Sequence, residues 1–211
     1  MTNEAIALAE SSSPVAAAER VRRTAVVAGL YGNLGAYKLL IENARRSTLS
    51  EIKRAMQSCE TVIVTDPSNG RALAILSLGH YLIGTNPWYI RLFNPFFGVE
   101  GSVSKGILEL ERGSRVGDTD AQFILKGALT REKRYGEALP LLRRLSSTYP
   151  RNIAFKLQIG QVAVILGLHG EVNDAFRTAL ELVRQDTKHD PRYTPTLVIS
   201  LANKSGVDIQ P

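Results

Sequence analysis

The sequence predicts an all-α fold, a solenoid of about four antiparallel helix pairs with an aromatic insertion. The first observation behind this prediction is a residue pattern that repeats with a period of 34 residues within residues 119–183. The two copies correspond at Ala138 and Val172 and at Leu142 and Phe176. A period of this length, with small residues where helices touch and large apolar residues in the seam, is typical of stacked helix-turn-helix repeats. The second observation is that turn residues separate the expected pairs.

The repeated segment resembles a tetratricopeptide repeat (TPR) in both of its helices. The residues that carry the resemblance are Ile124-Leu125-Lys126-Gly127-Ala128-Leu129, Arg134-Tyr135-Gly136-Glu137-Ala138-Leu139 and the closing Tyr149-Pro150. In that family the second helix opens with a Tyr-x-Glu-Ala run, which Tyr135, Glu137 and Ala138 fit. The next unit departs from the family pattern, with Val172 where a small Ala is usual and Arg184 where Pro is usual. The second departure predicts that this helix runs on.

Residues 21–166 are also similar to a bacterial subgroup of TPR proteins, a resemblance that implies four helix pairs and gives no activity to transfer. We expect a flexible leader over residues 1–15 and a helical repeat domain over residues 16–184. The units of that domain are expected at about 21–67, 70–116, 119–150 and 153–184. A C-terminal tail over residues 185–211 follows, and residues 196–202 are apolar enough to fold back and cap the last repeat.

Composition suits one ordinary globular domain. The chain has 211 residues, of which 44% are hydrophobic, enough to bury a continuous core. The single cysteine, Cys59, excludes an internal disulfide framework and any multi-cysteine metal site, and its helical surroundings predict a buried thiol. The formal net charge of +6 favours acidic partners or the negative surfaces of nucleic acids and membranes.

Neither a secretory signal nor a membrane-spanning segment is expected. Residues 1–15 lack the basic start and apolar middle of a signal peptide. The longest run without Lys, Arg, Asp or Glu, residues 72–90, is cut by Asn86-Pro87 and is too short for the roughly 20 residues a bilayer needs. We expect a cytoplasmic location. Because the first unit begins so close to Met1, the question whether a segment upstream of it is missing stays open.

An aromatic insertion interrupts the second unit. Residues 86–98 include Trp88, Tyr89 and Phe93 at a place where an ordinary repeat needs only a short turn. Long insertions usually carry function or pack on themselves. Two interpretations stay open: the aromatic side chains cap the core of the solenoid, or they form an exposed patch that contacts a partner or a membrane surface.

No catalytic or metal-binding motif is present. His80, His169 and His189 are far apart in the sequence, and none has a second ligand three or four residues away. Glu109 and Glu111 are two residues apart on an expected helix, so they point in different directions. Phosphate-binding and nucleophile-elbow motifs are missing as well. We therefore expect no enzyme activity, no cofactor and no bound metal.

The resemblance implies a protein-binding function. In TPR proteins the first helix of each pair lines an inner groove, and here those positions are mostly apolar, which favours an apolar or amphipathic peptide, or the chain's own tail, over a clamped acidic terminus. We expect a non-catalytic scaffold that binds a protein or peptide through this groove and the Trp88 insertion; a homo-oligomer stays open. The expected partner-binding residues are Tyr81, Trp88, Tyr89, Phe93, Phe123, Leu157 and Gln161.

Nucleic-acid binding is the alternative function. Eight basic residues between Lys126 and Lys156 motivate it, opposed only by Glu132 and Glu137. Charged outer faces are normal on solenoids, however, and no aromatic residues interleave with the cluster as base stacking requires. The two functions differ in salt dependence, because an affinity that depends on phosphate contacts falls steeply with salt.

Overall fold

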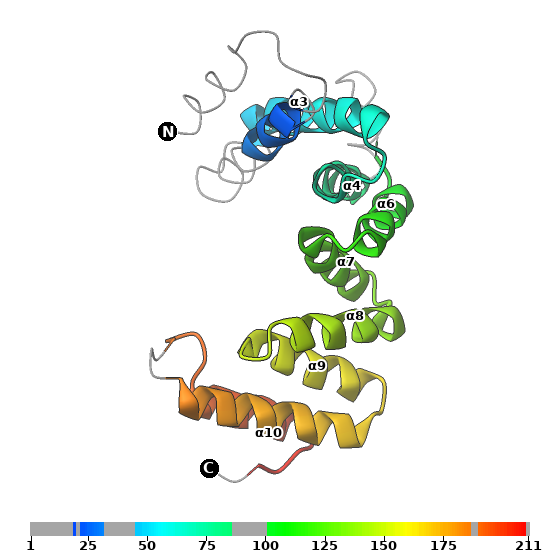
Figure 1. The fold of residues 1–211 in the computed structure, drawn as a ribbon. Helices are drawn as coiled ribbons and strands as arrows, with labels where there is room; N and C mark the ends of the chain where they lie inside the picture. Colours follow the sequence, from blue (N-terminus) through cyan, green and yellow to red (C-terminus); the bar gives the residue numbers. More distant parts are fainter. Residues whose placement is uncertain (1–18, 20–21, 32–44, 86–100, 187–189, 210–211) are drawn as a thin grey trace. The chain divides into compact units, whose positions relative to one another are not determined.

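The computed structural model describes residues 19, 22–31, 45–85, 101–186 and 190–209, and in these ranges it contains helices and no strand (Figure 1). Residues 22–31 are helical. The helices that follow are α3 (Arg45–Thr65), α4 (Gly70–Gly84), α6 (Val103–Arg115), α7 (Thr119–Arg131), α8 (Tyr135–Thr148), α9 (Ile153–Ile165), α10 (His169–Gln185) and α11 (Pro195–Lys204). The predicted all-α fold is confirmed.

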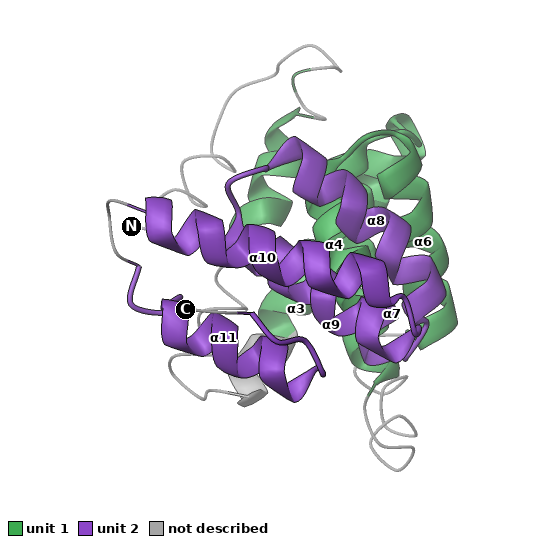
Figure 2. Cartoon of the chain, turned by 90° about the horizontal axis from the view of Figure 1, so that it is seen from below, with its two compact units in different colours: residues 1–128 green, residues 129–211 purple. Residues whose placement is uncertain are grey.

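Two compact units make up the chain, residues 1–128 and residues 129–211 (Figure 2). The boundary falls within α7, so most of this helix belongs to the first unit. The expected leader, residues 1–15, lies outside the described residues. The expected division of residues 16–184 into four repeat units stays a prediction.

The first unit has its core between residues 22–31, α3 and α4. Ala28, Met56, Cys59, Val62 and Leu76 are all buried in one apolar cluster. Cys59 and Val62 come from α3 and are three residues apart, so they lie on the same face of that helix. This face packs against α4, which is adjacent to α3 in space as well as in sequence.

A polar turn joins α3 to α4. The Asp66 carboxylate accepts hydrogen bonds from the Ser68 hydroxyl (2.9 Å) and the Asn69 amide (3.2 Å), and these bonds lower the pKa of Asp66. Asn69 in turn caps α4, because its side-chain oxygen accepts from the Ala72 backbone N–H at 3.1 Å. α3 ends at Thr65, directly before Asp66-Pro67.

Glycines allow α4 and α6 to approach closely. A Cβ atom added to Gly106 would lie 2.6 Å from the Tyr81 backbone nitrogen and 2.8 Å from the Ser77 carbonyl oxygen. A Cβ on Gly84 would collide with the Val103 backbone nitrogen at the start of α6. Since these neighbours are backbone atoms, they cannot move aside as a side chain can. The two helices therefore pack backbone to backbone along this line.

The second unit stacks α8, α9, α10 and α11 in chain order, each helix packing against the next. Gly160 of α9 faces Phe176 of α10, and a Cβ on Gly160 would lie 2.9 Å from the aromatic ring. Phe176 is fully buried, as is Ala138 of α8. α10 has 17 residues where α8 has 14, which confirms that this helix runs on through Arg184.

The last helix, α11, covers one side of α10 (Figure 2). Thr194 caps it by accepting from the Leu197 backbone N–H at 3.2 Å, and Pro195 occupies its first turn, where a missing N–H costs nothing. Val198 and Ala202 of α11 are fully buried in the same cluster as Phe176. Val207 and Ile209, which follow α11, are buried in that cluster too.

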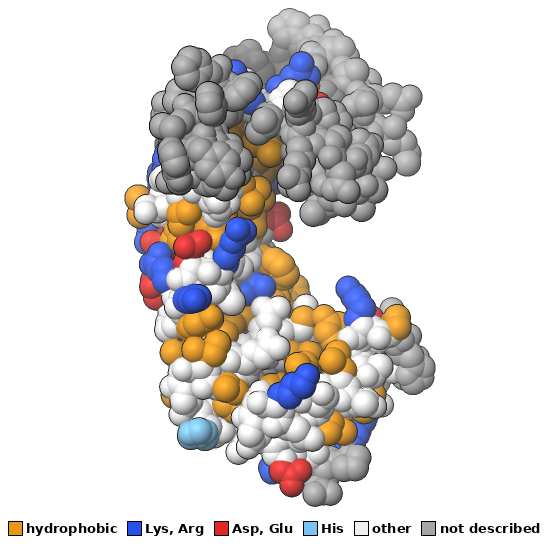
Figure 3. Space-filling view, turned by 180° about the vertical axis from the view of Figure 1, so that it is seen from behind, with side chains coloured by type: hydrophobic (Ala, Val, Ile, Leu, Met, Phe, Trp, Pro, Cys, Tyr) orange, Lys and Arg blue, Asp and Glu red, His pale blue; other side chains and the backbone are white. Residues whose placement is uncertain are grey.

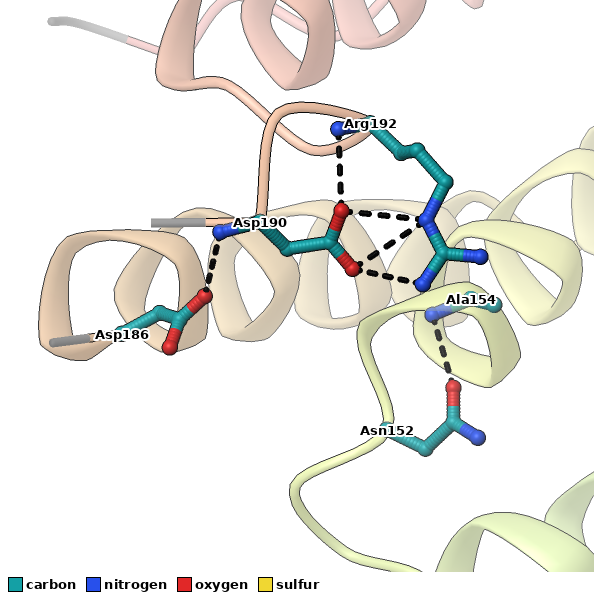
Figure 4. Close-up of polar contacts among 5 residues, drawn as sticks. All are labelled: Asn152, Ala154, Asp186, Asp190 and Arg192. Carbon is teal, nitrogen blue, oxygen red and sulfur yellow. Dashed lines mark hydrogen bonds and ion pairs between the residues drawn. The ribbon is translucent and has the colours of Figure 1, made fainter. Parts of the chain in front are cut away.

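Charged side chains hold the turn that leads into α11 (Figure 4). The Asp186 carboxylate accepts from the Asp190 backbone N–H at 3.1 Å, and the Asp190 carboxylate accepts from the guanidinium of Arg192 at 2.7 Å. The hydrogen bonds from Arg192 lower the pKa of Asp190 to about 2. Figure 4 also shows the Asn152 side chain, which accepts from the Ala154 backbone N–H and caps α9.

None of the helices in the described ranges combines the length and the apolar character needed to cross a lipid bilayer.

Burial of Cys59 gives a first testable prediction. Its side chain is inaccessible, and this burial raises the pKa of its thiol to about 12. Because the thiolate is the reactive form, we expect a thiol-reactive dye at pH 8 to label the folded protein on the order of 10³ times more slowly than the guanidinium-unfolded protein. Labelling of the folded protein within tenfold of the unfolded rate would contradict the packing of α3 on α4.

Candidate functional site

On α4 the expected partner-binding residue Tyr81 is buried. Tyr81 is 4% exposed and Ala74 1%, while Arg71 is exposed. The reason lies in α6: because Gly106 has no side chain, α6 comes close enough to cover both the backbone and the Cβ atom of Tyr81. Little of the Tyr81 side chain is therefore accessible to a partner.

On α7 the aromatic position is open. Phe123 is 50% exposed, and the ammonium of Lys126 lies 4.4 Å from the centre of its ring, a cation–π contact. Lys126 itself is only 8% exposed, and this burial lowers the pKa of its amine. Gly127 adds open space, since an added Cβ would meet no atom within 4 Å. The ring of Phe123 is therefore half exposed and is also in contact with the ammonium of Lys126.

On α9 the buried and exposed positions separate along the helix. Leu157, in the first half of α9, is 6% exposed and belongs to the cluster that also holds Val198 and Ala202 of α11. Gln161 is exposed, and so are Val164 (39%) and Ile165 (56%), three and four residues further on. Residues at this spacing share one face of a helix. Of the two expected partner-binding residues on α9, Gln161 is therefore accessible to a partner and Leu157 is not.

The exposed apolar surface continues through the turn from α9 to α10. Leu166 and Leu168, at the two ends of this turn, are 37% and 39% exposed. Gly167 between them has φ +71°, a conformation that glycine adopts without strain. We call the five residues Gln161, Val164, Ile165, Leu166 and Leu168 the α9 patch. Figure 3 shows one face of the molecule, on which hydrophobic side chains reach the surface among Lys and Arg side chains.

Sequence reasoning missed Ile165, Leu166 and Leu168 of this patch, although a signal was present. α9 is apolar on nearly all sides, and a helix of that kind is normally buried all round. In the second unit α9 packs against α8 and α10, which leaves Val164 and Ile165 uncovered. An apolar helix with two neighbours in a stack has more apolar surface than those neighbours cover.

Trp88, Tyr89 and Phe93 lie outside the described residues. Their contribution to a binding surface stays a prediction.

A polar network crosses from α4 to α6. The ring of His80 is 2% exposed and contacts two side chains of α6: Nδ1 lies 2.5 Å from Glu109 Oε2, and Nε2 lies 3.1 Å from Lys105 Nζ. The Glu109 side chain is 14% exposed, whereas Lys105 is exposed. The sequence gives no local sign of this network, because 25 and 29 positions separate His80 from Lys105 and Glu109.

The basic cluster that motivated the nucleic-acid alternative is partly neutralised. The guanidinium of Arg134 pairs with Glu137 at 2.5 Å, and that of Arg143 on α8 pairs with Glu171 on α10, also at 2.5 Å. Hydrogen bonds from Arg143 lower the pKa of Glu171. In these ion pairs, a carboxylate of the same chain neutralises each arginine. The structure gives no support to nucleic-acid binding by the basic cluster. In the part of the chain that the structure describes, no group of three or more His, Cys, Asp or Glu side chains could hold a metal ion.

Comparison with known proteins supports the fold. No protein-family model and no curated protein matches the sequence. Among solved structures, the chain is similar to YrrB, described as "a TPR protein with an unusual peptide-binding site", with a TM-score of 0.53 and 16% identity over 83% of this chain and 74% of that chain. It is also similar to the "MamA RS-1 ArsTM double mutant", with a TM-score of 0.51 and 13% identity over 85% of this chain and 92% of that chain.

At these identities the similarity shows the fold alone. Together with the helices described above, it shows that this chain has a TPR-like fold, an all-α helical-repeat solenoid.

Proposed function

We propose that this protein is a non-catalytic scaffold that binds a peptide segment of another protein on the α9 patch. The observation that carries the proposal is the exposure of four large apolar side chains within residues 164–168, at the end of α9 and in the turn after it, close in sequence to the exposed Gln161. Contiguous exposed apolar surface on a folded protein commonly marks an interaction site. The peptide-binding site named for YrrB supports a peptide as the ligand.

The charge of the second unit suggests which residues the peptide carries. Residues 129–211 contain 12 Lys and Arg but 8 Asp and Glu. The exposed basic residues of this unit include Arg144 and Arg151. An acidic residue beside an apolar anchor would be attracted to such a surface, although this attraction adds more to the association rate than to the affinity. The favoured ligand is therefore an apolar segment flanked by Asp or Glu.

Phe123 is proposed as a separate contact point in the first unit. Its ring is half exposed, and aromatic side chains are enriched among the residues that dominate binding energy. Trp88, Tyr89 and Phe93 are proposed as further contacts, on the ground that the sequence concentrates aromatic residues there.

A peptide-display selection on the whole chain tests the proposal. We expect selected peptides to be rich in apolar residues, and their affinity to fall at least about tenfold, or about 1.4 kcal/mol, in the double variant Val164→Ser/Ile165→Ser, because both anchors are lost. The matched control is Val64→Ser/Val116→Ser, which removes two exposed valines of the first unit. Affinity should be unchanged in the control.

Three results would count against the α9 patch. The selection yields no peptide, the Val164→Ser/Ile165→Ser variant binds as tightly as the wild type, or the affinity falls steeply between 50 and 500 mM salt as phosphate contacts would require. The variant Trp88→Ala/Phe93→Ala, with helicity measured in parallel, separates a contribution of the insertion from that of the patch.

A further inference from the structure

The contacts of His80 assign its protonated nitrogen. An ionised carboxylate accepts hydrogen bonds and cannot donate them, so the Nδ1 atom that faces Glu109 carries the hydrogen. In a neutral imidazole the other nitrogen then has a lone pair. That lone pair, on Nε2, faces Lys105 Nζ at 3.1 Å and accepts a hydrogen bond from it. The two hydrogen bonds are thus donated in the same direction: Lys105 donates to the His80 imidazole, and the imidazole donates to the Glu109 carboxylate.

We propose that Lys105 is a nucleophilic lysine that accepts acyl groups from thioesters, with His80 as its base and Glu109 as the positioning residue of that base. Activated nucleophiles in proteins show the same three roles: a nucleophile, a base within hydrogen-bonding distance, and a third group that orients the base. If these three side chains served only to hold α4 and α6 together, the amine of Lys105 would not need to be exposed. Here the His80 ring is buried and fixed, whereas Lys105 is exposed on α6.

The reaction balances without a further reagent. The Lys105 ammonium gives a proton to His80 Nε2, and the resulting amine attacks the carbonyl carbon of the thioester. A C–N bond forms, the C–S bond breaks, and the departing thiolate takes the proton from His80 to become a thiol. The acylated nitrogen still carries two hydrogens and releases one of them to water as a proton. The products are an acylated Lys105, a free thiol and one proton in solution, and the imidazole returns to its neutral form.

The surroundings of Lys105 suit an acyl chain. Leu108 follows three residues later on α6, on the same side of the helix, and is 57% exposed. An acyl group held at the Lys105 amine therefore has an apolar side chain beside it. Within the described ranges, Lys105 is the lysine whose amine contacts an imidazole, that of His80. Lys133 and Lys204 are exposed but do not belong to this network, so they serve as reference lysines in the same molecule.

The test measures acylation of each lysine by mass spectrometry after the whole protein is incubated with a small thioester, S-acetyl-N-acetylcysteamine. We expect Lys105 to react at least about tenfold faster than Lys133 and Lys204 in the same molecules. In protein unfolded by guanidinium the three lysines should react at similar rates. Equal rates in the folded protein would overturn the proposal.

Two variants test the base and its positioning residue. His80→Gln keeps a hydrogen-bond acceptor without a base, and Glu109→Gln removes the charge that orients the imidazole. In both we expect the rate of Lys105 to fall to within about threefold of the reference lysines while helicity and unfolding midpoint stay close to wild type. Asp120→Asn, which removes one exposed acidic charge from α7, is the control and should leave the rate of Lys105 unchanged.

The position of the hydrogen on the His80 ring is a further test, because a purely structural role for His80 does not require that hydrogen to be on Nδ1. In the wild type, ¹⁵N chemical shifts should show a neutral ring with hydrogen on Nδ1. A ring with hydrogen on Nε2 would overturn the proposal even if His80→Gln fails to fold. So would a folded Glu109→Gln variant whose Lys105 still reacts as fast as in the wild type.

Discussion

Replacing Gly106 by alanine is expected to lower the free energy of unfolding by about 3 kcal/mol. The new methyl group would lie 2.6 Å from the Tyr81 backbone nitrogen and 2.8 Å from the Ser77 carbonyl oxygen. To relieve these contacts α4 and α6 must separate, and small-to-large substitutions in a packed interior typically cost about 1–3 kcal/mol or more. Denaturant unfolding followed by far-ultraviolet circular dichroism measures the change.

Gly127→Ala is the matched control for Gly106→Ala. Both glycines lie within helices, but an added Cβ at Gly127 would meet no atom within 4 Å. Alanine has the higher helix propensity, so this variant is expected to gain about 0.5–1 kcal/mol. If the two variants change stability in the same direction, the close approach of α4 and α6 is wrong.

Phe176→Ala is expected to cost about 3–5 kcal/mol, the range for truncating a fully buried aromatic side chain. The ring fills the space that Gly160 leaves on α9, so its loss opens a cavity in the core of the second unit. Phe123→Ala, the same substitution at a ring that is 50% exposed, should cost less than about 1 kcal/mol.

A double-mutant cycle tests the contact between Phe176 and Gly160 directly. In the wild type, Gly160→Ala places a methyl group 2.9 Å from the ring and should destabilise the protein. In the Phe176→Ala background the same change fills part of the cavity and improves helix propensity, so it should stabilise. A coupling energy of about 1–2 kcal/mol is expected. Additive effects would show that the two residues do not touch.

Most of the helices could be predicted from the sequence because their signals are local. Asp66-Pro67 ends α3 through turn chemistry that needs no knowledge of distant residues. The 34-residue period likewise placed Ala138 at a fully buried position. These predictions depend on residues a few positions apart or on the repeat itself.

The positions that depend on how neighbouring helices pack could not be predicted. The family pattern placed Tyr81 on an inner face, but Gly106 on α6 brings a second backbone over it. Leu157 is buried in a cluster that includes the tail, which the repeat pattern does not describe. The contacts of His80 with Lys105 and Glu109 require the register between α4 and α6, and residues 86–100 stand between these helices in the sequence. A periodic pattern fixes which residues face inward, whereas the depth of each residue depends on its particular neighbours.

The position of α11 limits how far the second unit can grow. Each repeat of a helical stack leaves an apolar side on which another repeat can pack, and stacks of this kind end where a helix with a polar outer side covers it. α11 buries Val198 and Ala202 toward α10, and its exposed residues include Asn203 and Lys204 together with Leu197 near its start. A further repeat, from this chain or from another copy, would have to displace α11 before it could reach the apolar side of α10.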